Sequence, residues 1–347
     1  MDEKKDLMLD IRNLAVEYRT DDETVNAVNG VSLRIRKGKS LGLVGETGAG
    51  KTTTALAVLN LLPESTGVIT DGIISVDGEE IIKKNDSGKS VPAKTDSQMQ
   101  KIRGEKVAMI FQDPMTALNP IFTVGDQIAE AVLLHQNCSR KEAVAKAEEM
   151  LELVGIPAGR KDDYPHQFSG GMKQRVVIAM ALACNPSLLI ADEPTTALDV
   201  TIQAQVLEMI KELRERFGTS VLMITHDLGI IAETCDEVSV MYAGSIVEHG
   251  NLEDVFDRTR HPYTQGLFNS LPNIQDRTAR LKPIRGLMPD PANLPAGCAF
   301  ADRCDYACDA CRSAKPAGKW LTDTHYVACV LYEDGADEDR LGKEKQE

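Results

Sequence analysis

The chain has 347 residues, enough for about two domains, and 42% of them are hydrophobic, so it is able to bury a core. Its net charge of −14 argues against nucleic-acid binding, which needs clustered Lys and Arg side chains. The first ten residues, MDEKKDLMLD, lack the apolar stretch of a signal peptide. The longest apolar run, residues 176–184, is far shorter than the roughly 20 residues of a membrane-spanning helix. We therefore expect a soluble, cytosolic chain in which thiols stay reduced and disulfides are disfavoured.

The N-terminal part of the chain has the alternation that is typical of strands. Apolar residues alternate in residues 7–19 and 31–38, which predicts strands of a mixed sheet. Residues 40–45, SLGLVG, predict a short buried strand that runs directly into a glycine-rich turn. A helical pattern follows from Thr52.

Strands and helices then alternate along the chain. Asp77-Gly78 is typical of a hairpin turn, whereas residues 83–101 are polar and aperiodic and predict a surface loop. Strands are expected at residues 106–111, 187–192 and 220–225, and helices at about 124–134 and 140–154, from 171, at 200–217 and from 228. This alternation predicts parallel strands with helices on both faces of the sheet.

Residues 45–52 read GETGAGKT and fit the phosphate-binding pattern G-x-x-x-x-G-K-[ST]. The glycines let backbone N–H groups converge on phosphates, and the helix N-terminus adds positive potential. Lys51 is expected to reach the β- and γ-phosphates, and the Thr52 hydroxyl to bind Mg²⁺. The alternative is an ordinary glycine-rich turn, which the predicted strand before the motif and the helix after it argue against.

Residues 188–194, LLIADEP, place two carboxylates at the end of an apolar strand. Asp192 is expected to hold Mg²⁺ through water, and Glu193 to polarise the attacking water as general base. The alternative interpretation is that the two carboxylates are only solvated charges. The phosphate-binding motif that precedes them in the chain argues against it.

Residues 168–175, FSGGMKQR, resemble the signature motif of ATP-binding cassette (ABC) proteins, and ALACNPSLLIADEPTTALD follows closely. A Ser-Gly-Gly sequence at a helix start is a second anion site, because the glycines allow close approach and the helix dipole points at the ligand. In isolation, a flexible turn with Ser169 as N-cap would explain it equally well. The resemblance implies a dimer, in which the signature of one subunit closes over the ATP that its partner's phosphate-binding loop holds.

Other positions match cassette features in the same order. Tyr18 matches the aromatic residue that stacks on adenine, and Gln112 matches the glutamine that senses Mg²⁺ and the attacking water. Residues 197–199, Ala-Leu-Asp, match the loop that crosses the dimer interface. His226 matches the switch histidine that contacts the γ-phosphate, although a lone histidine at a strand end is more often structural.

The resemblance therefore implies Glu193, His226, Gln112 and Lys51 as catalytic residues. The implied ATP-binding residues are Tyr18, Gly45, Glu46, Thr47, Gly48, Ala49, Gly50, Lys51, Thr52, Thr53, Ser169, Gly170, Gly171 and Asp199. The implied Mg²⁺ ligands are Thr52, Gln112 and Asp192.

The implied fold is an α/β P-loop NTPase of the ABC cassette type, with a RecA-like core, an antiparallel β subdomain and a helical subdomain. We assign residues 1–258 to the cassette, with the helical subdomain at about 113–183. Residues 259–332 form a small cysteine-rich C-terminal extension, and the polar residues 333–347 are expected to be a disordered acidic tail.

Three features are similar to the nickel/dipeptide/oligopeptide branch of ABC importers. They are the SGGM form of the signature, the wording IFQDPMTALNP and HPYTQGLFNSLP, and the spaced cysteines near the C-terminus. In that branch the SGGM subunit is the D-type ATPase, and its partner ATPase carries SGGQ. The polar stretch at 83–101 is somewhat long for the family, and Cys308 is an additional cysteine.

The spaced cysteines Cys298, Cys304, Cys311 and Cys329 are separated by five, six and seventeen residues. Four thiolates suit a [4Fe–4S] cluster or a Zn²⁺ site, and the residues alone favour neither. Some members of the branch bind a [4Fe–4S] cluster here, so the resemblance favours the cluster, with Cys308 spare. Thiols without a metal are the remaining alternative.

These inferences together predict an ATP hydrolase that powers the import of di- or oligopeptides from the cytoplasmic face of the cell membrane. The expected partners are a second ATPase subunit, two transmembrane permeases and an extracytoplasmic solute-binding protein. The alternatives are import of nickel or another small solute, a soluble ABC protein acting on DNA or the ribosome, and a nucleotide-binding regulator without activity. The last is opposed by Glu193 and His226, and the soluble protein by the single cassette without a coiled-coil insertion.

Overall fold

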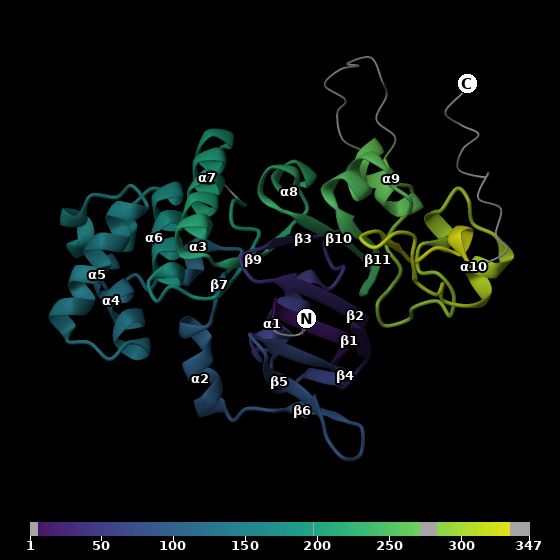
Figure 1. Cartoon of the computed structure of the whole chain (residues 1–347), viewed down its shortest axis with the longest axis horizontal. Coiled ribbons are helices and arrows are strands. Elements are labelled where there is room, and N and C mark those ends of the chain that lie inside the picture. The colour runs from purple at the N-terminus through teal and green to yellow at the C-terminus, as the bar shows by residue number, and fades with distance from the viewer. Residues whose placement is uncertain (1–5, 197, 271–282, 334–347) are drawn as a thin grey trace.

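The computed structural model describes residues 6–196, 198–270 and 283–333, in which two sheets form the framework (Figure 1). The smaller sheet has the order β2 (Thr24–Arg36), β1 (Leu7–Arg19), β4 (Gly67–Val76), β5 (Glu79–Lys84), β6 (Ser90–Pro92). The larger sheet has the order β12 (Lys319–Trp320), β13 (Tyr326–Val327), β11 (Ser245–Asn251), β10 (Glu237–Tyr242), β3 (Ser40–Val44), β9 (Ser220–Thr225), β8 (Leu188–Asp192), β7 (Val107–Ile110).

Most of the α-helices lie above the larger sheet or form a group beside it, and one lies next to the smaller sheet (Figure 1). They are α1 (Lys51–Val58), α2 (Asp96–Glu105), α3 (Pro114–Ala117), α4 (Val124–His135), α5 (Arg140–Leu153), α6 (Gly170–Leu182), α7 (Val200–Phe217), α8 (Leu228–Thr234), α9 (Pro262–Asn269) and α10 (Asp309–Ser313). Short 3₁₀ turns lie at Ala158–Asp162, Pro165–Gln167, Ala301–Arg303 and Val330–Tyr332, and a π turn lies at Glu253–Asp257. Within the described ranges, no helix is long and apolar enough to cross a membrane.

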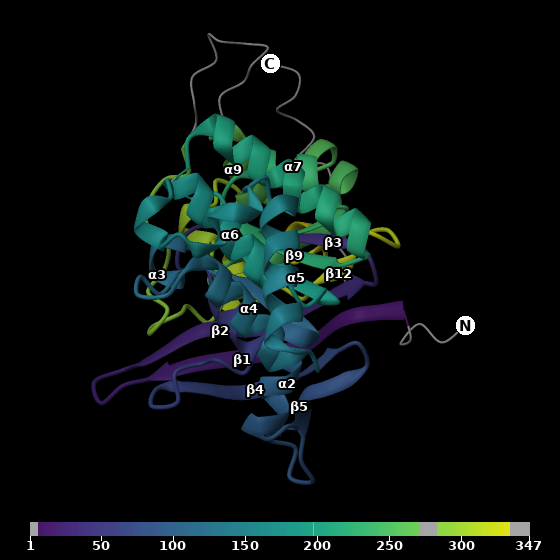
Figure 2. The same ribbon diagram turned by 90° about the vertical axis from the view of Figure 1, so that its left-hand side faces the viewer.

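Strand direction separates the two sheets. Strands β7, β8, β9, β3 and β10 run parallel, as the alternation of strands and helices predicted. The alternation predicted a mixed sheet for the first strands, but β2, β1, β4, β5 and β6 pair antiparallel to one another, so that expectation was wrong. The antiparallel β subdomain that the family resemblance implied is confirmed. The antiparallel sheet forms a layer of its own below the larger sheet, as Figure 2 shows from the side.

The predicted surface loop at residues 83–101 is partly ordered, which corrects the sequence interpretation. It contains β6 and the first half of α2. Thr95 caps α2, because its side chain accepts a hydrogen bond from the N–H of Gln98 and the Gln98 side chain accepts one from the N–H of Thr95. Met99 and Ile102 then bury their side chains in a core to which strands of both sheets contribute. The threonine-to-glutamine spacing is a capping box, and the high polarity of the stretch hid it.

The residues after β11 continue the larger sheet instead of standing apart from it. Strand β13 pairs antiparallel with β11 through His249 opposite Tyr326, and β12 pairs with β13. Phe300 is buried in the same core as the helices, and Cys298 and Cys304 pack against that core. Among the described residues of this region, a separate core holds four buried side chains, those of Val327, Cys329, Leu331 and Tyr332.

Two sequence predictions fall largely outside the described residues. One is Ala197 in the expected interface loop, and the other is the expected disordered tail, of which the structure describes only Glu333. The assigned domain boundaries remain predictions.

Candidate functional site

The glycine-rich turn at residues 45–50 connects β3 to α1, as predicted. Gly45 and Gly50 have φ angles of 155° and 101°. A Cβ at Gly45 would lie 2.1 Å from the carbonyl oxygen of Met241, and one at Gly50 would lie 2.3 Å from that of Ala27. A side chain at either position would collide with backbone, so only glycine allows the chain to turn this tightly against the neighbouring segments.

The Lys51 side chain is folded over this turn and is only 7% exposed. Its Nζ donates hydrogen bonds to the carbonyl oxygens of Gly45 (2.7 Å) and Glu46 (3.0 Å). Burial lowers the pKa of Lys51, and the nearby carboxylates of Glu193 and Asp192 oppose that effect. A partly desolvated ammonium group at a helix start is well suited to bind an anion such as phosphate.

Thr52 and Asp192 meet although 140 residues separate them, because α1 begins beside the end of β8. The Thr52 hydroxyl donates a 2.8 Å hydrogen bond to Oδ2 of Asp192. Asp192 is 2% exposed, and its burial raises the pKa of the carboxyl group, while the Thr52 hydrogen bond opposes this effect. Hydroxyl and carboxylate oxygens are ligands that Mg²⁺ prefers, so these two residues fit the expected ion.

Glu193 is the centre of a hydrogen-bond cluster next to this pair. Gln112 Nε2 and the Thr196 hydroxyl each donate to its Oε2 at 2.9 Å. His226 Nδ1 lies 3.1 Å from its Oε1. The backbone of Glu193 has a φ of 45°, and its N–H donates to the carbonyl of Ile224 in β9. A left-handed backbone at a non-glycine residue is strained, so this position is one that the surrounding structure enforces.

The cluster favours an ionised Glu193. Burial raises the pKa of its carboxyl group, but the hydrogen bonds from His226, Thr196 and Gln112 outweigh burial and bring the pKa below its usual value. The structure thus brings together three residues that the sequence predicted. Thr196 was missed, although it lies three residues after Glu193 in the turn that follows β8.

Tyr18 lies beside the start of α1, because its hydroxyl donates a 3.3 Å hydrogen bond to Oγ1 of Thr53. This contact brings the predicted adenine-stacking residue next to the phosphate-binding turn. In the same turn Thr47 and Gly48 are exposed, whereas Ala49 is buried.

The signature residues 169–171 begin α6 in the helical group, and Figure 1 shows this helix away from α1. The Ser169 hydroxyl accepts a hydrogen bond from the N–H of Met172, so it caps α6. Gly171 allows α6 to approach α7, because a Cβ there would lie 2.5 Å from Ile202. Asp199 caps α7 by accepting from the N–H of Ile202. One chain therefore does not bring its own signature to its phosphate-binding turn.

The eight cysteines all lie in the described residues, and none forms a disulfide. Burial, together with neighbouring thiols, raises the pKa of Cys304 to about 11 and that of Cys329 to about 12. The N–H of Cys298 donates a 2.7 Å hydrogen bond to the carbonyl of Cys311, so these two predicted ligands are neighbours. The Sγ atom of Cys308, expected to be spare, lies 3.6 Å from that of Cys311. Among the residues that the structure describes, however, no three His, Cys, Asp or Glu side chains are arranged to hold a metal ion, so the geometry gives no support to the predicted metal site.

Comparison with known families matches residues 28–196 to the ABC transporter model and residues 247–311 to the "Oligopeptide/dipeptide transporter, C-terminal region". The chain is 27% identical to the dimeric ATP-binding cassette MJ0796, solved in a post-hydrolysis state bound to ADP and Pi, with a TM-score of 0.61. That match covers 71% of this chain and 99% of MJ0796.

Similar proteins extend over nearly the whole length. The chain is 50% identical to the probable peptide ABC transporter ATP-binding protein y4tR of Sinorhizobium fredii, over 94% of this chain and 95% of that protein. It is 48% identical to the dipeptide transport ATP-binding protein DppD of Bacillus subtilis, over 95% and 96%, and 46% identical to the oligopeptide transport ATP-binding protein AppD of the same species, over 94% and 97%. The chain belongs to the ABC transporter family, among the ATP-binding proteins that carry the oligopeptide/dipeptide C-terminal region.

Proposed function

We propose that the chain is the ATP-hydrolysing subunit of a peptide importer. The observation that carries the proposal is the convergence of Gln112, Thr196 and His226 on Glu193, beside the pair formed by Thr52 and Asp192. The relatives named as dipeptide and oligopeptide transport proteins support the choice of substrate. Import of nickel or another small solute remains the alternative within the same family.

The residues of the site have separate tasks in this reaction. The glycine-rich turn and Lys51 bind and orient the phosphates of ATP. Thr52 and Asp192 would hold Mg²⁺, which when bound would neutralise charge that develops on the phosphate oxygens. Glu193 accepts the proton of the water that attacks the γ-phosphorus, and ADP and phosphate leave. Gln112 and His226 position the Glu193 carboxylate and the water.

The proposal includes a dimer. Ser169, Gly170, Gly171 and Asp199 lie on the helical side of the chain, away from its own phosphate-binding turn, so they are suited to act on a partner's ATP. The dimeric state of MJ0796 supports this arrangement. The partner that we propose is a second ATPase with an SGGQ signature, and the pair binds two permeases on the cytoplasmic face of the membrane. A solute-binding protein delivers the peptide from the other side.

A [4Fe–4S] cluster on Cys298, Cys304, Cys311 and Cys329 is also retained as a proposal. It is supported by the backbone hydrogen bond between Cys298 and Cys311 and by the small core around Cys329, which a bound centre would reinforce. A Zn²⁺ site on the same cysteines is the alternative.

Glu193→Gln tests the hydrolytic function. This variant keeps the turn and the Mg²⁺ ligands but removes the base, so ATP should still bind while hydrolysis falls about 100-fold or more. Glu215→Gln, at an exposed position on α7, is the matched control and should hydrolyse ATP at the normal rate. Turnover by Glu193→Gln within a few-fold of the wild type would refute the assignment of the base.

A further inference from the structure

The C-terminal part of the chain contacts the phosphate-binding turn at Glu46. Arg303 Nη1 donates a 3.0 Å hydrogen bond to Oε2 of Glu46, although 257 residues separate the two in the sequence. The N–H of Glu46 donates a 3.0 Å hydrogen bond to the hydroxyl of Tyr263 in α9. Met288 lies against the same turn, because a Cβ at Gly48 would be 3.1 Å from its Cε. Residues beyond β11 therefore contribute to the wall of the candidate ATP site.

The guanidinium group of Arg303 is fixed on several sides. Its side chain is 7% exposed, and its Nη1 also donates to the hydroxyl of Tyr242 at 3.1 Å. Its Nε donates to the carbonyl of Arg285, and its plane lies near the rings of Tyr242 and Phe300, with centroids 5.7 and 6.0 Å away. A group held in this way keeps its position when Glu46 changes.

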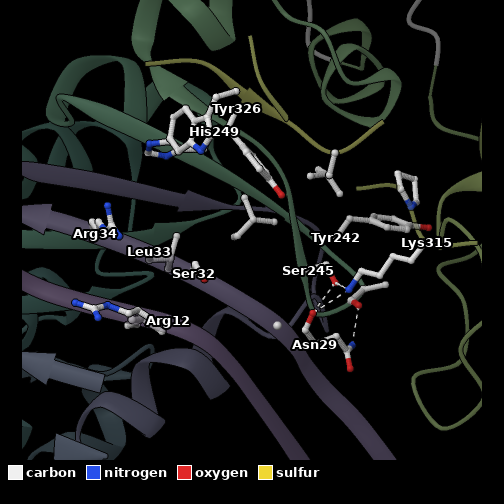
Figure 3. A pocket seen from close by; sticks show the side chains of 18 of the residues that line it. Arg12, Asn29, Ser32, Leu33, Arg34, Tyr242, Ser245, His249, Lys315 and Tyr326 are labelled. Atoms are coloured by element: carbon white, nitrogen blue, oxygen red, sulfur yellow. Dashed lines mark hydrogen bonds between the residues drawn. The ribbon is translucent and has the colours of Figure 1, made fainter. Parts of the chain in front are cut away.

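Close to this contact, a cavity of about 890 Å³ lies between the cassette and the C-terminal part of the chain (Figure 3). The side chain of Lys315 bridges one end of the cavity, where its Nζ donates 2.9 Å hydrogen bonds to the carbonyl of Asn29 and the hydroxyl of Ser245. Lys315 thus binds the framework of the cassette, whereas Arg303 reaches a residue of the phosphate-binding turn itself. Of these two cationic side chains, Arg303 is the one that acts directly on the candidate site.

The negative charge of Glu46 opposes the binding of phosphate at that site. Its carboxylate belongs to the turn that would bind the negatively charged phosphates, and it is 30% exposed. Like charges at a partly exposed site repel one another, and salt screens part of this repulsion. The paired guanidinium of Arg303 offsets this charge.

We propose that Arg303 is a positioning residue of the nucleotide site, which neutralises and holds Glu46 so that the turn accepts phosphate. The inference rests on the proposed function, since it assumes that this turn binds ATP. It assigns the C-terminal extension a direct part in nucleotide affinity, through a residue next to Cys304.

A double-mutant cycle at Arg303 and Glu46 tests the inference. We would measure the Kd of the full chain for the Mg²⁺ complex of a non-hydrolysable ATP analogue at low and high salt. Arg303→Gln should raise the Kd roughly three- to tenfold, with the larger effect at low salt. Glu46→Gln combined with Arg303→Gln should bind more tightly than Arg303→Gln alone, because the unpaired carboxylate is gone. In ATPase assays Arg303→Gln should raise KM with kcat little changed.

Two further variants separate charge from packing. Arg303→Lys keeps the positive charge and should bind within about twofold of the wild type. Arg312→Gln, at an exposed arginine of the same region, is the control and should bind as the wild type does.

The outcomes distinguish the inference from the proposed function. If the single variant Arg303→Gln does not fold, the double variant is compared with the single variant Glu46→Gln, and equal Kd values for these two support the proposal. A double variant at least threefold weaker than Glu46→Gln, or a folded Arg303→Gln that binds as the wild type does, overturns the inference alone. If the wild-type chain binds no nucleotide, or if Lys51→Ala leaves its Kd for the ATP analogue unchanged, both the inference and the proposed function are overturned.

Discussion

The imidazole Nδ1 of His226 lies 3.1 Å from the Oε1 of Glu193, although 33 residues separate them in the chain. Glu193 follows β8 and His226 follows β9, and these two strands are parallel neighbours in the larger sheet. The carboxyl ends of parallel strands meet at one edge of a sheet, which is where open α/β sheets bind their ligands. The geometry that places these two residues is therefore a consequence of the topology.

The pH dependence of hydrolysis should follow the hydrogen bonds to Glu193. A bond to the ionised carboxylate lowers its pKa, and burial raises it, so Thr196→Val should raise the pKa by removing one donor. The acid limb of kcat should then move to higher pH. Thr196→Ser keeps a hydroxyl and should retain the wild-type profile. Identical pH profiles for the two variants would show that this hydrogen bond does not set the pKa.

Ser169→Arg should impair the ATP site of the partner subunit. In a dimer with the second ATPase, photo-cross-linking of labelled ATP should fall at the partner's phosphate-binding loop and persist at the loop that contains Lys51. The variant also removes the N-cap of α6, so Ser139→Arg, which removes the N-cap of α5, is the matched control. A defect confined to the Lys51 site would contradict the trans arrangement.

Anaerobic purification with iron, sulfide and zinc analysis should distinguish the metal proposals. About four iron and four sulfide per chain, with broad absorbance that bleaches on reduction, is expected for the cluster. Cys304→Ser should lose the metal, whereas Cys308→Ser should keep it. One zinc without sulfide would indicate a structural zinc site instead. No metal would refute both, and the opposite behaviour of the two variants would refute the choice of ligands.

The capping box of α2 should contribute measurably to stability. Thr95→Ala removes the side chain that accepts from Gln98 N–H, and loss of such a cap costs about 1 kcal/mol. Because the entropy of unfolding grows with chain length, we expect the midpoint of thermal unfolding to fall by about 1–2 °C in a chain of this size. Ser97→Ala, at an exposed position inside the same helix, should change the midpoint much less. Equal effects of the two substitutions would argue against a capping role for Thr95.

Local patterns determined much of the fold. The apolar runs of β3, β8 and β9 are buried along their whole length, and this burial is why short hydrophobic segments between turn signals predicted them well. The polar segment that contains β6 and α2 was misjudged, because its order depends on a cap and two buried side chains within a polar stretch. The alternation alone did not give the strand direction of the first sheet, since it reports which face is buried and not how strands pair, whereas the family resemblance correctly implied an antiparallel β subdomain.

For the candidate site, the sequence by itself determined which residue types are present and in what order: the glycine-rich turn with Lys51 and Thr52, the two carboxylates after β8 and the histidine after β9. Those motifs are local, so their spacing along the chain identifies them. Only the tertiary structure decided that Thr196 joins Gln112 and His226 on Glu193, and that Arg303 pairs with Glu46. A contact between residues 257 apart depends on how the C-terminal part docks on the larger sheet, and this docking arises from burial of Phe300 and pairing of β13 with β11.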